Sequence, residues 1–275
     1  MGIEEFFGAI RDRCSSDDEY AVELLKARGF LLEDNELALS DNSHPDDEDY
    51  LNMVLQKEHL GGVKNGKITL IPNGNMEKIF SKEHVGGMEG FCDRAGWQLF
   101  VQNSYAPKVP VSILEPFIAR YVKAISACGV KTSSSCDGNH PERRRAAMHV
   151  QPCDEANVLW HDIIYKRCVY PFFNLRWREQ NCYLIEIRVT ETDKWETYVK
   201  VNRVAEFIYA NRLVLRQVRQ DATEVISNSM ANHMTNNALS EIFRDRANEL
   251  LDKCWLTVNM RMVRSRKDRK PNQNT

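Results

Sequence analysis

The sequence predicts an α+β fold: a largely antiparallel sheet flanked by helices, with a small acidic helical part at the N-terminus. Three observations support this prediction. Apolar residues recur every three or four positions in several segments, which is typical of amphipathic helices. Other short segments alternate apolar and polar residues, as strands do. The helical and strand-like segments also follow one another without the regular strand–helix–strand rhythm of a parallel sheet.

The N-terminal part is predicted to be helical. Residues 3–30 form two short helices, with a capping stretch at 15–18 and Gly29 as the end of the second helix. An acidic loop at 41–49 leads into a further helix at 49–60, and a strand at 67–71 ends in the turn 72–75.

A short sequence occurs twice in this region. Residues 57–62 read KEHLGG, and residues 82–87 read KEHVGG. We favour two helix ends that stop at glycine, since two short copies do not make a repeat architecture. The alternative is a single site that contains both histidines.

The second half mixes strands with longer helices. A helix at 110–128 is expected from its three- and four-residue apolar spacing, with Gly129 as its end. A hairpin follows, in which residues 129–135 and 146–150 are the strands and the polar segment between them contains the turn. The remaining predicted elements are a strand at 97–102, a helix at 156–167, a strand at 182–189, and helices at 198–221 and 238–254.

The composition bounds the class of protein. The chain has 275 residues, of which 43% are hydrophobic and 28% charged, and this balance is ordinary for a soluble globular protein. No stretch resembles a membrane helix, and the first residues do not resemble a signal peptide. The eight cysteines are scattered, as in proteins of reducing compartments. We therefore expect a cytoplasmic protein.

Charge is distributed unevenly along the chain. The first 100 residues carry 20 acidic and 10 basic side chains, whereas the rest carries 19 acidic and 27 basic ones. This indicates an anionic ligand for the second part, docking between the parts, or two independently solvated surfaces. We expect an acidic helical part at 1–60, an α+β main domain at 61–260, and a basic, disordered tail at 261–275.

Two cysteines and two histidines cluster around the predicted hairpin. Cys136, His140, His149 and Cys153 follow the order C-x3-H-x8-H-x3-C, and the loop between the histidines carries Arg143, Arg144 and Arg145. Thiolates and imidazoles are the ligands that Zn²⁺ prefers. The cluster therefore predicts either a zinc site or the wall of a polar cleft, whose basic loop would hold phosphate.

A second candidate lies on the predicted strand at 182–189. Glu186 and Arg188 are two residues apart, so they share one face of this strand. In a cleft, the carboxylate could bind a divalent cation and the guanidinium could hold a phosphate. On a solvated face, the same residues would only form ion pairs.

Together these segments resemble the glutamate–cysteine ligase and amidoligase group over residues 110–190. The shared features are an amphipathic helix, the Ser135-Cys136 pair, the strand segment Met148-His149-Val150, and the later apolar-Glu-apolar-Arg segment at 185–188. The resemblance implies an antiparallel sheet that binds Mg-ATP, phosphorylates a carboxylate and passes the acyl group to an amine. It further implies that His149 is the motif histidine, Glu186 a magnesium ligand and Arg188 a phosphate-binding residue.

The leading hypothesis is a metal-assisted enzyme acting on a nucleotide or another phosphate-bearing small molecule, most concretely an ATP-dependent carboxylate–amine ligase. In it, His140 and His149 position substrate or shuttle a proton, and the 143–145 loop binds phosphate. The alternative is a nucleic-acid-binding module with zinc at the hairpin. Its basic surface would combine Arg176-Trp177-Arg178 with a helical stripe made of Arg212, Arg216 and Arg219.

Overall fold

The computed structural model describes residues 2–33, 37–84, 109–130, 132–137, 147–152, 160, 173–178, 182–188, 194–232 and 245. The α-helices are α1 (Ile3–Arg11), α2 (Asp17–Arg28), α3 (Asp46–Lys57), α5 (Ala119–Ala127), α7 (Lys194–Ala210) and α8 (Arg212–Asn232). Short 3-10 helices span η1 (Met76–Phe80), η2 (Lys82–His84) and η3 (Val111–Ile113). The strands are β1 (Gly61–Lys64), β2 (Lys67–Leu70), β3 (Thr132–Cys136), β4 (Ala147–Pro152), β5 (Phe173–Arg178) and β6 (Cys182–Arg188).

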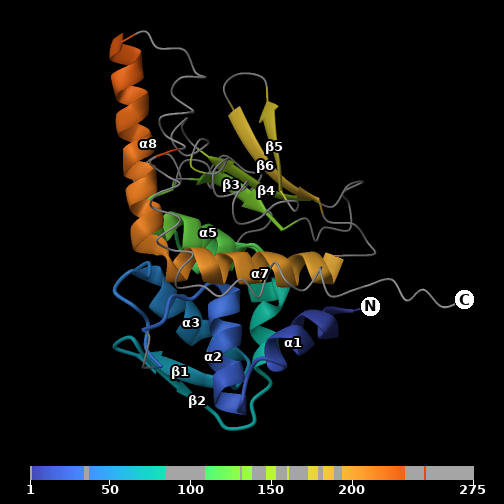
Figure 1. Ribbon diagram of the computed structural model, residues 1–275. Helices are drawn as coiled ribbons and strands as arrows, with labels where there is room; N and C mark the ends of the chain where they lie inside the picture. The colour runs from blue at the N-terminus through green and yellow to red at the C-terminus, as the bar shows by residue number, and fades with distance from the viewer. Residues whose placement is uncertain are drawn as a thin grey trace, which may run out of the picture.

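Both sheets are antiparallel, and the fold is α+β as predicted. β1 pairs with β2, and the second sheet has the order β3-β4-β6-β5. In Figure 1, α5 and α7 lie between the N-terminal helices and the four-stranded sheet, and α8 rises beside that sheet. The four-stranded sheet therefore lies next to the helical layer that contains α5, and β3 contacts α5.

The two helices predicted for residues 3–30 are confirmed as α1 and α2. Both predicted ends of α2 are also confirmed. The Ser16 hydroxyl accepts a hydrogen bond from the Glu19 N–H at 3.1 Å and begins α2. Gly29 ends α2 with φ +105°, and a Cβ at this position would lie 2.9 Å from the Cβ of Ala119. Only glycine fits this left-handed turn against α5 without strain.

The next helix begins earlier than predicted. α3 starts at Asp46, directly after Pro45, and four acidic residues fill its first turn, where the helix dipole favours negative charge. The Asp47 carboxylate accepts a hydrogen bond from the His44 N–H at 3.0 Å at this helix start. The strand at 67–71 is confirmed as β2. Its partner β1 was not predicted, since it begins with two glycines. Gly61 has φ +143°, and a Cβ there would lie 2.0 Å from the Thr69 carbonyl oxygen.

Two long helices of the sequence prediction are each divided. The segment 110–128 forms η3, an extended residue at Leu114 and then α5. Pro116 explains the interruption, because it lacks an N–H and restricts the residue before it. The segment 198–221 forms α7 and α8, which meet at Asn211, whose side-chain amide donates to the Phe207 carbonyl oxygen at 2.9 Å.

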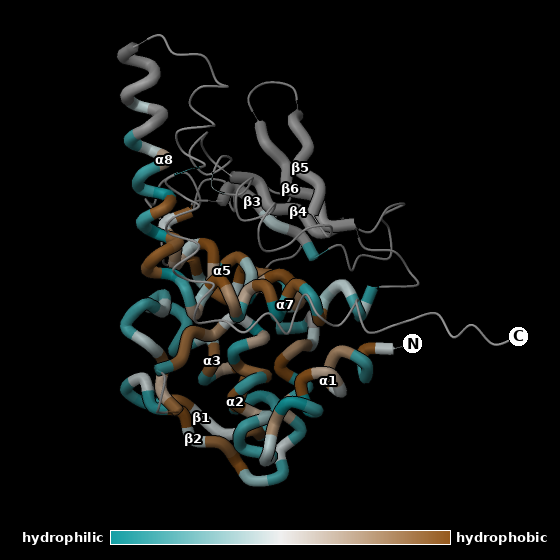
Figure 2. Tube along the Cα trace, viewed as in Figure 1, coloured by the Kyte–Doolittle hydropathy of each residue, from teal (hydrophilic) through white to brown (hydrophobic). Residues whose placement is uncertain are grey.

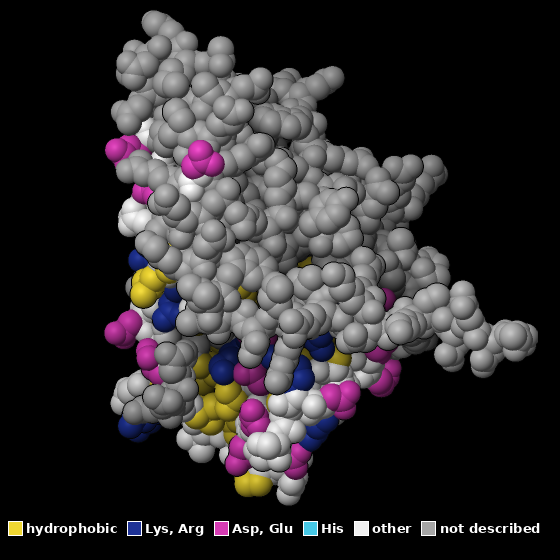
Figure 3. All heavy atoms as spheres, in the orientation of Figure 1, with side chains coloured by type: hydrophobic (Ala, Val, Ile, Leu, Met, Phe, Trp, Pro, Cys, Tyr) yellow, Lys and Arg dark blue, Asp and Glu magenta, His cyan; other side chains and the backbone are white. Residues whose placement is uncertain are grey.

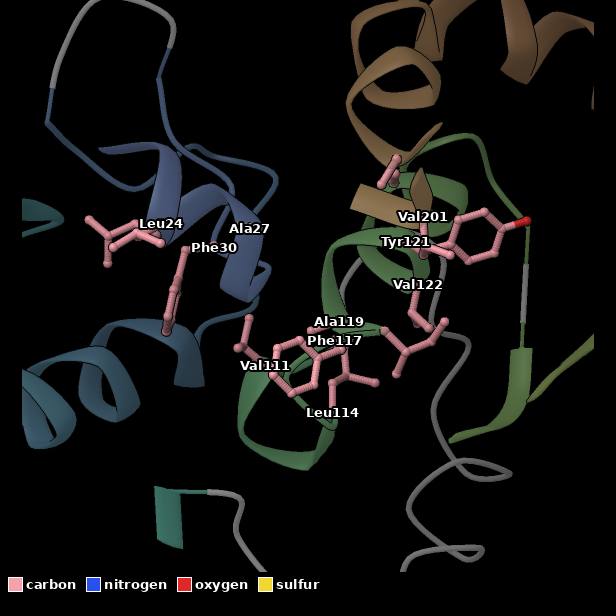
Figure 4. Close-up of a cluster of buried hydrophobic side chains, with 14 of the residues drawn as sticks. Leu24, Ala27, Phe30, Val111, Leu114, Phe117, Ala119, Tyr121, Val122 and Val201 are labelled. Carbon is pink, nitrogen blue, oxygen red and sulfur yellow. The ribbon is translucent and has the colours of Figure 1, made fainter. Parts of the chain in front are cut away.

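One hydrophobic core joins the N-terminal helices to the later ones. Figure 4 shows apolar side chains from residues 111–122 between α2 and α7, and Figure 2 shows α5 as largely hydrophobic. The Phe117 ring contacts Phe6 on α1 at 5.3 Å and Tyr198 on α7 at 4.6 Å between centroids. The core therefore continues across the boundary that we expected at residue 60.

A buried ion pair fixes α3 to α5. The Lys123 ammonium donates to the Asp47 carboxylate at 2.8 Å and to the Val109 carbonyl oxygen at 2.6 Å, and both charged side chains are fully buried. The Asp47 carboxylate also accepts from the Val111 N–H at 2.7 Å. These bonds satisfy both charges and tie the segment before α5 to α3.

Several predicted elements lie outside the described residues. These are the strand at 97–102, the helices at 156–167 and 238–254 apart from Trp160 and Asp245, and the tail at 261–275. Trp160 is buried, and its indole N–H donates to the Leu215 carbonyl oxygen of α8 at 2.8 Å.

Candidate functional site

The second sheet places three of the predicted site positions in one row. Its register pairs Cys136 on β3 with His149 on β4, and His149 with Glu186 on β6. Glu186 is in turn paired with Asn174 on β5. Residues directly opposite each other in antiparallel strands share a face and have Cβ atoms about 4.5–5.5 Å apart. Cys136, His149, Glu186 and Asn174 therefore occupy adjoining backbone positions across the sheet.

The same register gives this sheet one polar and one apolar face, because residues alternate between faces along each strand. The face that contains the row consists of Ser134, Cys136, Ala147, His149, Gln151, Asn174, Arg176, Arg178, Cys182, Leu184, Glu186 and Arg188. The opposite face consists of Thr132, Ser135, Met148, Val150, Pro152, Phe173, Leu175, Trp177, Tyr183, Ile185 and Ile187. An apolar face of this kind packs into a core. The polar face is therefore the one suited to a ligand.

Four of the nine predicted site residues lie on this polar face. These four residues are Cys136, His149, Glu186 and Arg188. Arg188 is paired with Ala147, two residues along the strands from the pair of His149 and Glu186. His140, Cys153 and the loop Arg143–Arg145 lie outside the described residues. The backbone register thus places Cys136, His149, Glu186 and Arg188 at positions on one face of the sheet.

Sequence reasoning missed the contribution of β5. This strand adds Asn174, Arg176 and Arg178 to the polar face. Its sequence alternates strictly, and this pattern was sufficient to predict a strand. The register also places Trp177 at a position on the face opposite Arg176 and Arg178.

The end of β3 is held in the protein core. The Asp137 N–H donates to the Glu115 carboxylate, and the Asp137 carbonyl oxygen accepts from the Tyr198 hydroxyl at 3.0 Å. The Asp137 side chain is fully buried. Nearby, burial lowers the pKa of Arg28, an effect that Tyr50 and Asp137 oppose. Cys136 therefore precedes a residue whose backbone N–H and carbonyl oxygen both form hydrogen bonds. Such bonds hold the backbone in place, and a functional site requires that its residues be held in position.

The proposed arginine stripe on α8 is engaged within the fold. The Arg216 guanidinium donates to the Ala127 carbonyl oxygen at 2.8 and 3.2 Å, at the C-terminal end of α5. Arg212 donates to the Tyr209 carbonyl oxygen at 3.1 Å and lies over the Tyr209 ring. Both arginines stabilise helix ends, which is where cations are favourable. In Figure 3, the described acidic and basic side chains in the lower part of the view are interspersed.

The two copies of the repeated hexapeptide contact each other. Glu58 of the first copy binds the His84 imidazole of the second at 2.9 Å, and Lys57 pairs with Glu83 at 3.8 Å. His84 is buried, whereas His59 is exposed at the end of α3 with φ +56°. The first copy follows the end of α3, as favoured, and the described part of the second copy forms η2.

Among the side chains that the structure describes, no group of three or more His, Cys, Asp or Glu residues is arranged to hold a metal ion. The side chains of Cys136, His149 and Glu186 lie outside that set, and their row is placed by the backbone register. None of the helices in the described ranges has the length and apolar character needed to cross a membrane.

Comparisons with known proteins found no matching family model, no matching curated protein and no matching solved structure. The resemblance to the ligase group, which rests on residues 110–190, therefore stays a prediction.

Proposed function

We propose that the polar face of the four-stranded sheet is the active site of a metal-assisted enzyme that acts on a nucleotide or another phosphate-bearing small molecule. The most concrete form is an ATP-dependent carboxylate–amine ligase located in the cytoplasm. The observation that carries the proposal is the register, which aligns Cys136, His149 and Glu186 in one row with Arg188 beside it.

The residue types on this face fit magnesium and a nucleotide. Mg²⁺ is usually bound through one or two carboxylates together with substrate phosphates, and Glu186 is the carboxylate available in the row. Arginine binds phosphate in a planar, bidentate manner, and Arg188, Arg176 and Arg178 share the face. Bound magnesium would neutralise phosphate charge during activation of a carboxylate.

The other residues of the site have roles that follow from their chemistry. We assign to His149, which is paired with Glu186 in the register, the role of the base that accepts a proton from the attacking amine. Arg188 holds the phosphate that leaves. His140 and the loop Arg143–Arg145, which connects β3 to β4 in the sequence, supply further positive charge and hydrogen-bond donors to the substrate.

The proposal predicts magnesium-dependent ATP turnover that requires Glu186. The full chain is incubated with Mg²⁺, ATP, a mixture of the common amino acids as carboxylates, and hydroxylamine as the amine, and phosphate and hydroxamate are measured. Glu186→Gln should reduce both products by at least about two orders of magnitude, because a metal contact worth several kcal/mol is lost.

A matched control separates this effect from a general change of charge. Glu196 on α7 is exposed and pairs with Lys200 within its own helix, so Glu196→Gln should leave turnover unchanged. Turnover that is equal in the wild type and Glu186→Gln would remove Glu186 from the site. The absence of magnesium-dependent products with every carboxylate would contradict the ligase.

The second candidate function is a nucleic-acid-binding module with structural zinc. One observation favours it: Cys136 and His149, two of the four predicted ligands, are directly opposite each other. Salt-sensitive oligonucleotide binding that survives Glu186→Gln, in a protein that holds stoichiometric zinc, would support this module over the ligase.

A further inference from the structure

Two asparagine–glycine pairs lie in turns of the N-terminal part, Asn65-Gly66 and Asn73-Gly74. Both asparagines are exposed, and both have positive φ, +52° at Asn65 and +60° at Asn73. An asparagine that precedes glycine is open to an intramolecular reaction, because glycine has no Cβ to shield its backbone nitrogen from the asparagine side chain. The two pairs differ in how this nitrogen is held.

The Asn65-Gly66 pair is the two-residue turn between β1 and β2, which Lys64 and Lys67 close. The Gly66 N–H donates to no acceptor among the described residues, whereas its carbonyl oxygen accepts from the Leu39 N–H at 2.8 Å. The space beside Gly66 is open, since the nearest atom to a Cβ built there would be the Leu39 carbonyl oxygen at 4.0 Å. The Gly66 nitrogen is therefore accessible to the Asn65 side chain and to solvent.

The Gly74 nitrogen is engaged. Its N–H donates to the Ile71 carbonyl oxygen at 3.2 Å, and the Gly74 carbonyl oxygen accepts from the Met76 N–H at 3.0 Å. A Cβ built on Gly74 would lie 2.9 Å from Cδ2 of Leu60, whose side chain is buried. This turn is packed against the core, and its glycine nitrogen must lose a hydrogen bond before it can react.

We propose that Asn65 is a site of covalent modification, at which the Gly66 nitrogen closes a cyclic imide on the asparagine side chain and water then opens the imide. The Gly66 nitrogen loses its proton to hydroxide and attacks Cγ of Asn65. A carbon–nitrogen bond forms, and the bond between Cγ and Nδ2 breaks. The side-chain nitrogen leaves with that electron pair, takes up a proton from water and is released as ammonia. No atom is oxidised or reduced.

Water opens the imide at either of its carbonyl carbons. Opening at Cγ gives aspartate, and opening at the backbone carbonyl carbon gives isoaspartate. Both products bring a negative charge to a hairpin tip that otherwise carries the exposed Lys64 and Lys67. Isoaspartate also adds a methylene group to the backbone of the turn, which should disturb the pairing of Lys64 with Lys67. Neither step uses Mg²⁺ or ATP, so the reaction is independent of the proposed function.

Peptide mass spectrometry of the native full chain tests the proposal. The protein is kept at body temperature and neutral pH, samples are digested over time, and asparagine, aspartate and isoaspartate are separated at residues 65 and 73. A hydrogen bond such as that of the Gly74 N–H contributes about 1 kcal/mol, so Asn65 should be converted at least about fivefold faster than Asn73. Aspartate and isoaspartate should both appear at residue 65, because one imide gives both.

Two variants and the unfolded chain are the controls. Asn65→Gln should remove the modification at residue 65, since the longer side chain must close a larger ring. Asn73→Gln should leave the rate at Asn65 unchanged. In urea both pairs are released from the fold, so they should react at similar rates. Circular dichroism of each variant, compared with the wild type, shows that it is folded.

Several results would overturn the proposal. Conversion of Asn73 as fast as that of Asn65 in the native chain would remove the effect of the free Gly66 N–H. A preference for Asn65 that persists in urea would assign the difference to the neighbouring sequence and not to the turn. Aspartate alone at residue 65 would indicate direct hydrolysis without an imide. An Asn65 that stays intact while the unfolded chain is fully converted would show that the hairpin protects it.

Discussion

Replacing Asp47 with alanine is expected to lower the free energy of unfolding by about 3–5 kcal/mol. The variant leaves the Lys123 amino group fully buried without its carboxylate, with the Val109 carbonyl oxygen as its one remaining partner among the described residues. The Val111 N–H also loses its acceptor. Urea unfolding followed by circular dichroism measures the loss.

The controls show whether the buried charge is the cause. Glu83→Ala removes an exposed ion pair with Lys57 and should cost at most about 1 kcal/mol. The double variant Asp47→Leu with Lys123→Met replaces both charges by apolar groups and should recover most of the loss. A loss in Asp47→Ala no larger than that in Glu83→Ala would show that Lys123 reaches water.

The loss in Asp47→Ala should also depend on pH. Burial lowers the pKa of Lys123, and the charge of Asp47 opposes this effect. Without Asp47 the folded state favours the neutral amine still more, so the unfolded chain binds the extra proton. Stability of the variant relative to the wild type should therefore rise as the pH increases toward the ordinary pKa of lysine. A loss that grows with pH would contradict this.

Replacing Phe117 with alanine should cost about 3–5 kcal/mol, because the cavity cannot be filled by its rigid aromatic neighbours. The Phe117 ring is stacked on Phe80 at 5.7 Å and on Tyr198 at 4.6 Å, and it meets Trp195 edge-on at 5.3 Å. It thereby joins the N-terminal helices to α7. The variant should unfold in one transition at lower denaturant, since both sides share this contact.

Met53→Ala is the matched control for this variant. Its side chain is 47% exposed on α3, so its loss should be within about 0.5 kcal/mol. Two separate unfolding transitions in Phe117→Ala, one of them unchanged from the wild type, would show that the N-terminal helices fold independently of α7.

The sequence was most informative where local chemistry determines structure. Ser16 and Gly29 define both ends of α2, because capping bonds and left-handed turns depend on a few adjacent residues. Helix interruptions were harder to predict. Apolar spacing continues through Pro116 and Asn211, but the helix is interrupted at both places. β1 escaped prediction because its two glycines carry no side-chain pattern.

The sequence predicted which residues belong to the candidate site, but it did not predict that they align across the sheet. Cys136, His149, Glu186 and Arg188 were identified from their types and spacing. Their alignment depends on the order β3-β4-β6-β5, in which β6 rather than β5 pairs with β4. That order is set by packing of the whole sheet, and a shift of one residue would move every position to the opposite face. A single sequence does not encode it locally.

Native mass spectrometry of the full chain tests the central claim most directly, namely that the polar sheet face is a magnesium–nucleotide site. The protein is purified without added metal, weighed, and weighed again after titration with Mg²⁺ and ATP. The account predicts a metal-free chain that binds one Mg-ATP, and loss of this binding in Glu186→Gln. A zinc ion that is retained through purification, is absent in Cys136→Ser and is needed for folding would contradict it.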